Sequence, residues 1–174
     1  GLAAQWLGVN QTQANSVAPI LISEEQGRHK STFCRMLMPP QLARYYSDNL
    51  KLTAQGNPER LLAEMGLLNM DEFDKFGAQK MPLLKNLMQM SSLNICKAYQ
   101  KNFRSLPRIA SFIGTSNRTD LLCDPTGSRR FICIEAEHDI DCTGIEHSQI
   151  YAQLKEELLA GARHWFNKEE EHAL

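Results

Sequence analysis

Several features that would place this chain in a special class are missing from its 174 residues. No apolar run approaches the roughly 20 residues needed to cross a bilayer, and no basic segment followed by an apolar one opens the chain. We therefore expect a cytoplasmic protein with no membrane partner. The five cysteines form no Cys-x-x-Cys pair and their number is odd, which favours reduced thiols over a disulfide framework.

The composition that remains is that of an ordinary globular protein, with 43% hydrophobic and 22% charged residues. There is no internal repeat and no low-complexity linker. We expect one domain over residues 18–166, a lead-in segment over residues 1–17 that follows a missing N-terminal region, and an acidic tail over residues 167–174. Residues 97–130 hold seven basic side chains and two acidic ones, which indicates a local anion site in a chain of net charge −1.

Apolar periodicity predicts strands that alternate with helices, which is typical of a mainly parallel α/β sheet flanked by helices. A stretch that alternates in part between apolar and polar residues, 93–106, predicts a basic β-hairpin or extended arm. The expected strands are residues 18–22, 45–52, 66–70, 108–115 and 131–137. The expected helices start at Lys30, at Pro58 behind an Asn57 N-cap, near Met81 and at His147.

The stretch around Lys30 has the order that a phosphate-binding loop requires: a short buried strand, a polar loop, then a helix N-terminus that favours an anion. In such a loop Lys30 reaches the β- and γ-phosphates and the Ser31 hydroxyl holds Mg²⁺. The full pattern has two glycines where this chain has Glu24 and His29, and only the interior Gly27 remains. The residues alone also fit a polar turn with a solvated lysine.

Polar side chains also follow two later strands, and an arginine pair comes directly before the strand expected at 131–137. Asp71 and Glu72 suit one acid on Mg²⁺ and a second that polarises water, although both also suit capping of the next segment. Asn117 suits orientation of the attacking water, or a simple turn. Arg129 and Arg130 suit contact with the nucleotide of a neighbouring subunit, or structural pairing with acids.

Together the blocks Glu25-Gln-Gly27, Lys30-Ser-Thr-Phe33, Asn69-Met-Asp-Glu-Phe73, Gly114-Thr-Ser-Asn117 and Asp124-Pro-Thr-Gly-Ser-Arg-Arg-Phe131 resemble the virulence-associated protein E family. These are P-loop ATPases of phage and mobile-element type, akin to superfamily-3 helicases and primase-helicases in the AAA+ class. The resemblance implies a P-loop NTPase fold that uses ATP and Mg²⁺. It implies that the nucleotide-binding loop consists of Gln26, Gly27, Arg28, His29, Lys30, Ser31 and Thr32.

The resemblance further implies roles for the later blocks. It makes Asp71 and Glu72 the catalytic acid pair, with Ser31 and Asp71 on the metal, and Asn117 the sensor. It makes Arg129 or Arg130 the trans-acting finger of a homo-oligomeric ring, a hexamer in the family. The basic arm would meet single-stranded or forked DNA through Lys97, Tyr99, Lys101 and Arg104, where Tyr99 could stack on a base.

The resemblance leaves two functions open. The effect of Glu24 and His29 on nucleotide binding decides between them. A non-glycine residue in a left-handed conformation costs roughly 1–2 kcal/mol, and a carboxylate about 6 Å from a phosphate charge costs about 3 kcal/mol at an effective dielectric of 20. The first function is an ATP-driven DNA helicase motor. The second is a hydrolysis-deficient DNA-binding or assembly module. A small-molecule kinase shares Lys30-Ser-Thr32 but would not need the basic arm.

Overall fold

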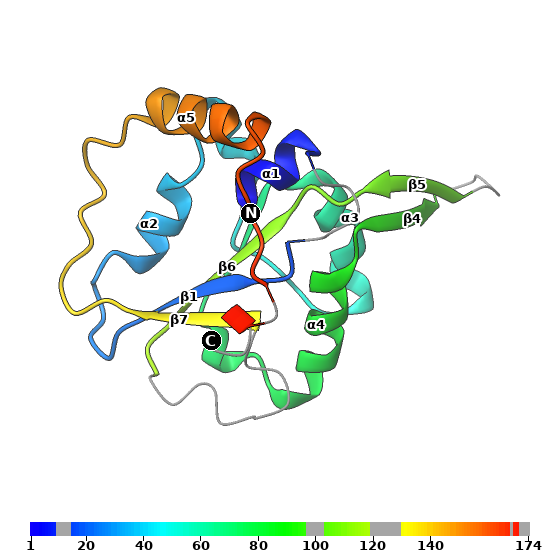
Figure 1. Ribbon diagram of the computed structural model, residues 1–174. Helices are drawn as coiled ribbons and strands as arrows, with labels where there is room; N and C mark the ends of the chain where they lie inside the picture. Colours follow the sequence, from blue (N-terminus) through cyan, green and yellow to red (C-terminus); the bar gives the residue numbers. More distant parts are fainter. Residues whose placement is uncertain (10–14, 97–102, 119–129, 168, 171–174) are drawn as a thin grey trace.

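The computed structural model describes residues 1–9, 15–96, 103–118, 130–167 and 169–170 (Figure 1). The strands are β1 (Ala18–Ile22), β2 (Tyr46–Ser47), β3 (Leu67–Met70), β4 (Ser92–Cys96), β5 (Phe103–Pro107), β6 (Ser111–Ser116) and β7 (Phe131–Glu135). The α-helices are α1 (Leu2–Leu7), α2 (Lys30–Met36), α3 (Pro58–Glu64), α4 (Met81–Gln89) and α5 (His147–Leu159). Short 3₁₀ helices are η1 (Pro40–Tyr45), η2 (Ala54–Gly56), η3 (Phe73–Lys75) and η4 (Ala78–Lys80).

Five strands form one sheet in the order β2-β3-β6-β1-β7, and every neighbouring pair is parallel. This confirms the mainly parallel α/β fold expected from the sequence. Strand β1 lies between β6 and β7, with Ile20 opposite Gly114 on one side and Cys133 on the other. Because all five strands run the same way, their carboxyl ends meet at one edge of the sheet, where ligands of such folds bind.

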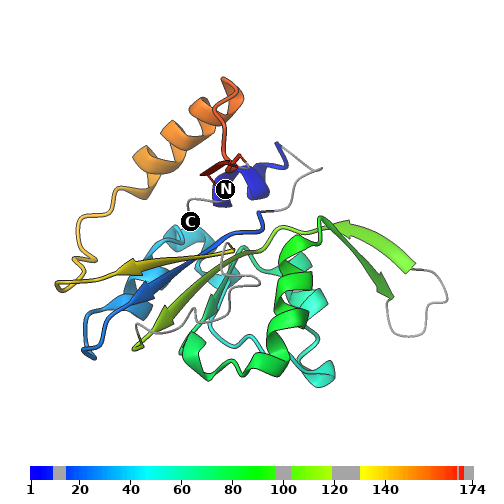
Figure 2. The same ribbon diagram turned by 60° about the horizontal axis from the view of Figure 1, so that its bottom comes forward.

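Helices cover both faces of the sheet. On one face the buried core joins Ile20, Leu68 and Phe112 of the strands to Leu84 and Met88 of α4. On the other face α2 packs on the sheet through Cys34, against Leu21, Leu67 and Ile113. In Figure 2, α1 and α5 lie on one side of the sheet and α3 and α4 on the other. No helix within the described ranges is long and apolar enough to cross a membrane.

The sequence predicted most of these elements to within a few residues, including the separate antiparallel pair β4–β5. The strand expected at residues 45–52 was wrong: only Tyr46–Ser47 pairs with β3, and Pro40–Tyr45 forms a 3₁₀ helix. Leu50 and Leu52 instead enter the core from an irregular segment. Asn57 does precede α3, but its side chain makes no capping hydrogen bond because its backbone is left-handed, with φ of 47°.

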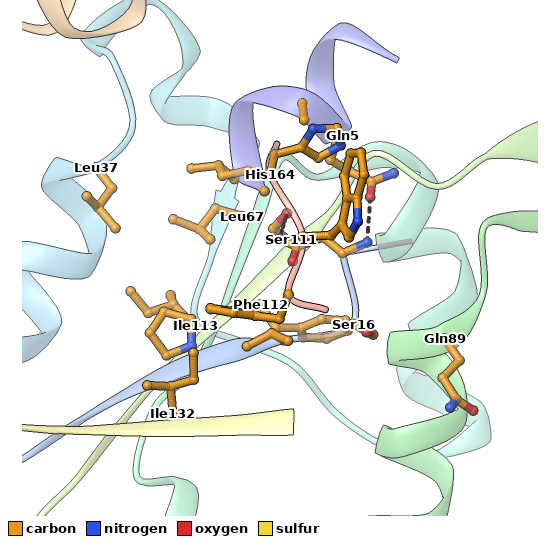
Figure 3. Close-up of a pocket in the computed structure, with 18 of the residues that line it drawn as sticks. Gln5, Ser16, Leu37, Leu67, Gln89, Ser111, Phe112, Ile113, Ile132 and His164 are labelled. Atoms are coloured by element: carbon orange, nitrogen blue, oxygen red, sulfur yellow. Dashed lines mark hydrogen bonds between the residues drawn. The ribbon is translucent and has the colours of Figure 1, made fainter. Parts of the chain in front are cut away.

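A cavity of about 730 Å³ lies on the α2 side of the sheet, beneath α1 and the segment after α5 (Figure 3). Ile113 and Ile132 of the strands, Leu37 and the ring of His164 line it. Trp165 and Phe166 also line this cavity and stay 45% and 40% exposed. None of its lining residues belongs to the polar hollow described next.

Candidate phosphate-binding site

A polar hollow of about 450 Å³ lies at the carboxyl edge of the sheet, between the β1–α2 loop and the ends of β3 and β6. Three stretches that are far apart in the sequence line it. They are Gln26, Gly27, Arg28, His29, Lys30, Ser31 and Thr32 from the loop and α2, Asp71 and Glu72 after β3, and Thr115, Ser116 and Asn117 at the end of β6. The sequence predicted ten of these residues. Thr115 and Ser116 were quoted only as part of a motif.

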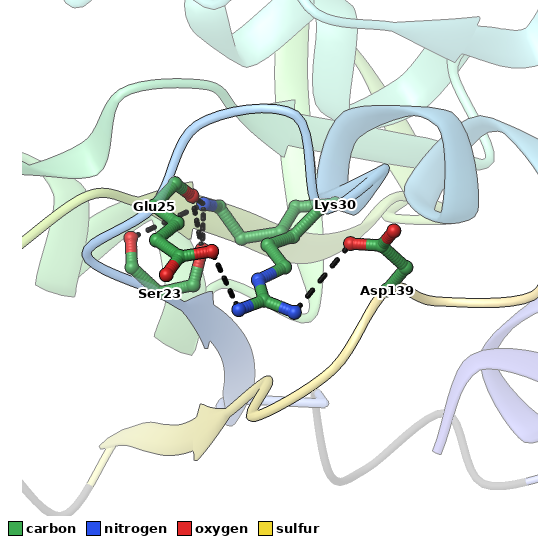
Figure 4. A network of polar contacts seen from close by, with 5 residues as sticks. Ser23, Glu25, Lys30 and Asp139 are labelled. Carbon is green, nitrogen blue, oxygen red and sulfur yellow. Dashed lines mark hydrogen bonds and ion pairs between the residues drawn. The ribbon is translucent and has the colours of Figure 1, made fainter.

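Lys30 carries a buried positive charge at this hollow. The residue is only 7% exposed, and the hydrogen bonds described for its ammonium all go to uncharged oxygens. Figure 4 shows those to Ser23 and Glu25. Nζ donates to Ser23 Oγ at 2.6 Å and to Asn117 Oδ1 at 2.9 Å. Burial and the charge of Arg28 lower the pKa of Lys30, whereas Asp71 raises it. A buried cation that lacks a hydrogen-bonded anion suits the binding of one.

Asp71 is held at the hollow by two hydroxyl groups. Ser31 Oγ and Thr115 Oγ1 both donate to its Oδ1 atom, at 2.8 and 2.6 Å. Thr115 Oγ1 also accepts a hydrogen bond from the backbone amide of Glu72 at 3.3 Å. Oxygen donors that converge in this way are the ligand type that Mg²⁺ prefers. The residues present therefore fit a magnesium site at Ser31 and Asp71.

Glu72 is exposed and forms an ion pair with Lys75, in which Oε2 lies 2.6 Å from Nζ. Its backbone is left-handed, with φ of 51°. Within the described residues only three non-glycine positions have a positive φ, and two of them, His29 and Glu72, line the hollow. Such strained residues concentrate at functional sites, so this pattern favours a binding or catalytic role for the hollow.

A second set of contacts, made by Arg28, also holds the loop. Arg28 pairs with Glu25 at 2.6 Å and with Asp139, beyond β7, at 3.5 Å (Figure 4). The backbone amide of Ile140 also donates to the carbonyl of Arg28 at 3.3 Å. The guanidinium is thus engaged by two carboxylates, and its contact with a nucleotide stays a prediction.

The two positions that lack the expected glycines differ from each other. His29 is left-handed, with φ of 60°, as a glycine position would be. Glu24 is exposed, does not line the hollow and does not have a positive φ. Water screens an exposed carboxylate, so its repulsion of a phosphate is smaller than the sequence predicted. The main local cost of the altered loop therefore falls on His29.

Replacing His29 with glycine should raise the free energy of unfolding by about 0.5–1 kcal/mol. Glycine removes the left-handed strain of about 1–2 kcal/mol, while the greater freedom of the unfolded chain returns about 0.4–1 kcal/mol. Urea denaturation followed by circular dichroism measures the difference. Asn57→Gly is the matched control, because asparagine tolerates φ of 47° better and should gain less. A destabilised His29→Gly variant would show that the histidine side chain makes a favourable contact.

Several predicted site residues fall elsewhere. Lys97, Tyr99, Lys101 and Arg129 lie outside the described residues. Arg104 is exposed on β5, as a DNA contact on an arm requires, and Arg130 is half-buried just before β7 without lining the hollow. Their roles stay predictions.

Three residues that hold other groups in place through hydrogen bonds were not identified from the sequence. Ser23 and Thr115 orient Lys30 and Asp71, and their only sequence signal was a position at a strand end next to a motif. Arg108 was counted in the basic stretch, but it is 1% exposed and binds backbone carbonyls at the end of α4. It is therefore unavailable to an external anion.

The parallel sheet, with helices on both faces and Lys30 and Ser31 at the start of the helix after β1, defines a parallel α/β domain. The chain belongs to the virulence-associated protein E-like domain family, which matches residues 9–174. A search of curated proteins finds no matching relative.

Solved structures of similar fold include three apo structures of the C-terminal region of NrS-1, two of them in an A form. Their sequence identities are 22%, 22% and 19%, with TM-scores of 0.54, 0.52 and 0.53. The alignments cover 99%, 99% and 93% of this chain but only 46%, 37% and 40% of those chains. At these identities the likeness is one of fold.

Proposed function

We propose that this domain binds ATP with Mg²⁺ and is the motor domain of a mobile-element replication protein, of the primase-helicase type, that remodels or unwinds DNA. One observation carries the nucleotide assignment: a buried lysine, a serine–aspartate pair and a polar strand end converge on one hollow from three separate stretches of the chain. Membership of the family supports the replication role. The exposed Arg104 on the two-stranded arm supports contact with DNA.

Six residues of the hollow then have roles. Lys30 binds the β- and γ-phosphates, Ser31 and Asp71 hold Mg²⁺, and Thr115 keeps Asp71 in place. When bound, Mg²⁺ would neutralise charge on the phosphates. Glu72 takes the proton of the attacking water after it releases Lys75, and Asn117 orients that water. Arg129 or Arg130 acts on the nucleotide of the next subunit in a ring.

A second function has its own support. The carboxylate of Glu72 is paired with Lys75, and His29 occupies a left-handed position at the point where backbone amides would meet a phosphate. A domain that keeps the fold but does not hydrolyse ATP would act as a DNA-binding or assembly module.

Titration calorimetry with MgATP and MgADP separates the two functions, on the chain itself and on a variant with Glu24→Gly and His29→Gly. We expect micromolar binding by the chain itself, with ATP turnover stimulated by single-stranded or forked DNA. Binding by the glycine variant alone would favour the module. Failure of both proteins to bind would overturn the nucleotide assignment.

A further inference from the structure

Ser23 occupies a junction between the strand that carries the loop and the strand that carries Asn117. It is the first residue after β1 and is only 4% exposed. Its backbone amide donates to the carbonyl of Ser116 at 3.2 Å, which fixes Ser23 against the end of β6. Its position is thus set by the sheet rather than by the loop.

The Ser23 hydroxyl both donates and accepts a hydrogen bond. It donates to the carbonyl of Glu25 at 2.6 Å and accepts a hydrogen bond from Lys30 Nζ at 2.6 Å. The same ammonium also reaches the carbonyls of Ser23 and Glu25, at 3.3 and 3.5 Å. One hydroxyl group therefore ties the lysine to the loop it must serve (Figure 4).

Asn117 also holds the ammonium: its Oδ1 atom accepts a hydrogen bond from Nζ at 2.9 Å. A lysine has a flexible four-carbon stem whose rotamer freedom is worth about 2 kcal/mol. Groups that hold it in its working position before the ligand arrives remove this cost from binding. We call the oxygens of Ser23, Glu25 and Asn117 that accept hydrogen bonds from the ammonium the clamp on Lys30. These oxygens are uncharged, so the positive charge of Lys30 stays available to an anion.

We propose that Ser23 is a positioning residue for phosphate binding: through its hydroxyl it holds the Lys30 ammonium at the hollow before a nucleoside di- or triphosphate enters. The inference rests on the proposed function for the identity of the ligand, but the clamp on Lys30 is testable without any nucleotide.

The first experiment measures the reactivity of Lys30 in the protein alone. Trace acetylation with acetic anhydride, read by peptide mass spectrometry, is normalised to the exposed Lys155 of α5. We expect Lys30 to react at least fivefold faster in Ser23→Ala than in the natural chain. Ser23→Thr, which keeps the hydroxyl, should react at the natural rate. An equal rate in Ser23→Ala would overturn the proposal.

The second experiment measures MgADP affinity by calorimetry. Ser23→Ala should bind about tenfold more weakly, equivalent to about 1.4 kcal/mol, and Ser23→Thr should bind within twofold of the natural chain. Ser148→Ala, an exposed serine on α5, is the matched control and should bind normally. Unchanged or tighter binding by Ser23→Ala would overturn the proposal, because the hydroxyl would then be irrelevant to the phosphate or compete with it.

The two experiments separate this inference from the proposed function. If the natural chain binds no MgADP, the nucleotide assignment fails, and the acetylation rates still decide whether Ser23 holds Lys30. If the natural chain binds MgADP and Ser23→Ala binds equally well, the nucleotide assignment stands and the inference about Ser23 fails.

Discussion

Replacing Lys30 with methionine is expected to weaken MgATP and MgADP binding by at least about a hundredfold, or about 2.7 kcal/mol. Methionine keeps most of the apolar stem of the lysine and removes only the charge that, in the proposed function, faces the phosphates. The ammonium now lies in a buried setting, where a charge interacts more strongly than in water. Calorimetry measures the affinity, and DNA-stimulated ATP turnover should disappear with it.

The fold should survive this change, since Ser23 and Asn117 can turn to water in the hollow once the ammonium is gone. Thermal unfolding checks this directly. Lys155→Met on α5 is the matched control, because that lysine is exposed and remote from the hollow. Nucleotide binding by Lys30→Met within threefold of the natural chain would contradict the assignment of the hollow. DNA binding should remain if the domain acts as a non-hydrolysing module.

Replacing Arg108 with methionine is expected to lower the free energy of unfolding by about 3 kcal/mol, with no direct effect on the hollow. The guanidinium donates to the carbonyls of Met88 and Met90 at the end of α4, at 2.5 and 3.3 Å. It also donates to those of Ala110 and Asn15, at 2.8 and 2.7 Å. Without the guanidinium these carbonyls lose a hydrogen-bond donor. A buried polar group left without a partner lowers the stability of the fold by about 1–3 kcal/mol.

Part of that loss is offset, because Arg108 is itself costly to bury. Burial lowers its pKa to about 10. Arg108→Lys should lose less stability than Arg108→Met, since it keeps the charge but lacks the planar fork that reaches several carbonyls at once. Urea unfolding measures both variants. Arg104→Met, exposed on β5, is the control and should change stability by less than about 0.5 kcal/mol. A stability of Arg108→Met equal to that of the control would show that water replaces the guanidinium.

Lys30 and Arg108 show what a sequence can and cannot reveal about the position of a charged side chain. Lys30 was identified because its neighbours in the chain form a motif, and the structure places it at the hollow. Arg108 lies in the basic stretch 97–130, and its burial depends on α4 and on Asn15, which is 93 residues away in the sequence. The charge count assigned Arg108 to an anion site, because a count of charges holds no information on side-chain burial, which is a property of the packed fold.

The elements of the sheet were predictable for a local reason. Strand β1, the loop and the start of α2 follow from short-range patterns: apolar residues, then polar ones, then a helix start at Lys30. The bounds of strand β2 could not be predicted in this way. Tyr46–Ser47 forms a strand only through its pairing with β3, and Leu50 and Leu52 pack in the core instead of extending the strand.

By itself, the sequence determined the order of strands and helices and the identity of the residues that reach the carboxyl edge, since both depend on local patterns and motifs. The tertiary structure alone decided which atoms meet there. Lys30 binds Asn117 across 87 residues, and Ser31 meets Asp71 across 40. Those contacts depend on β1 lying beside β6 and β6 beside β3, a strand order set by packing on both faces of the sheet.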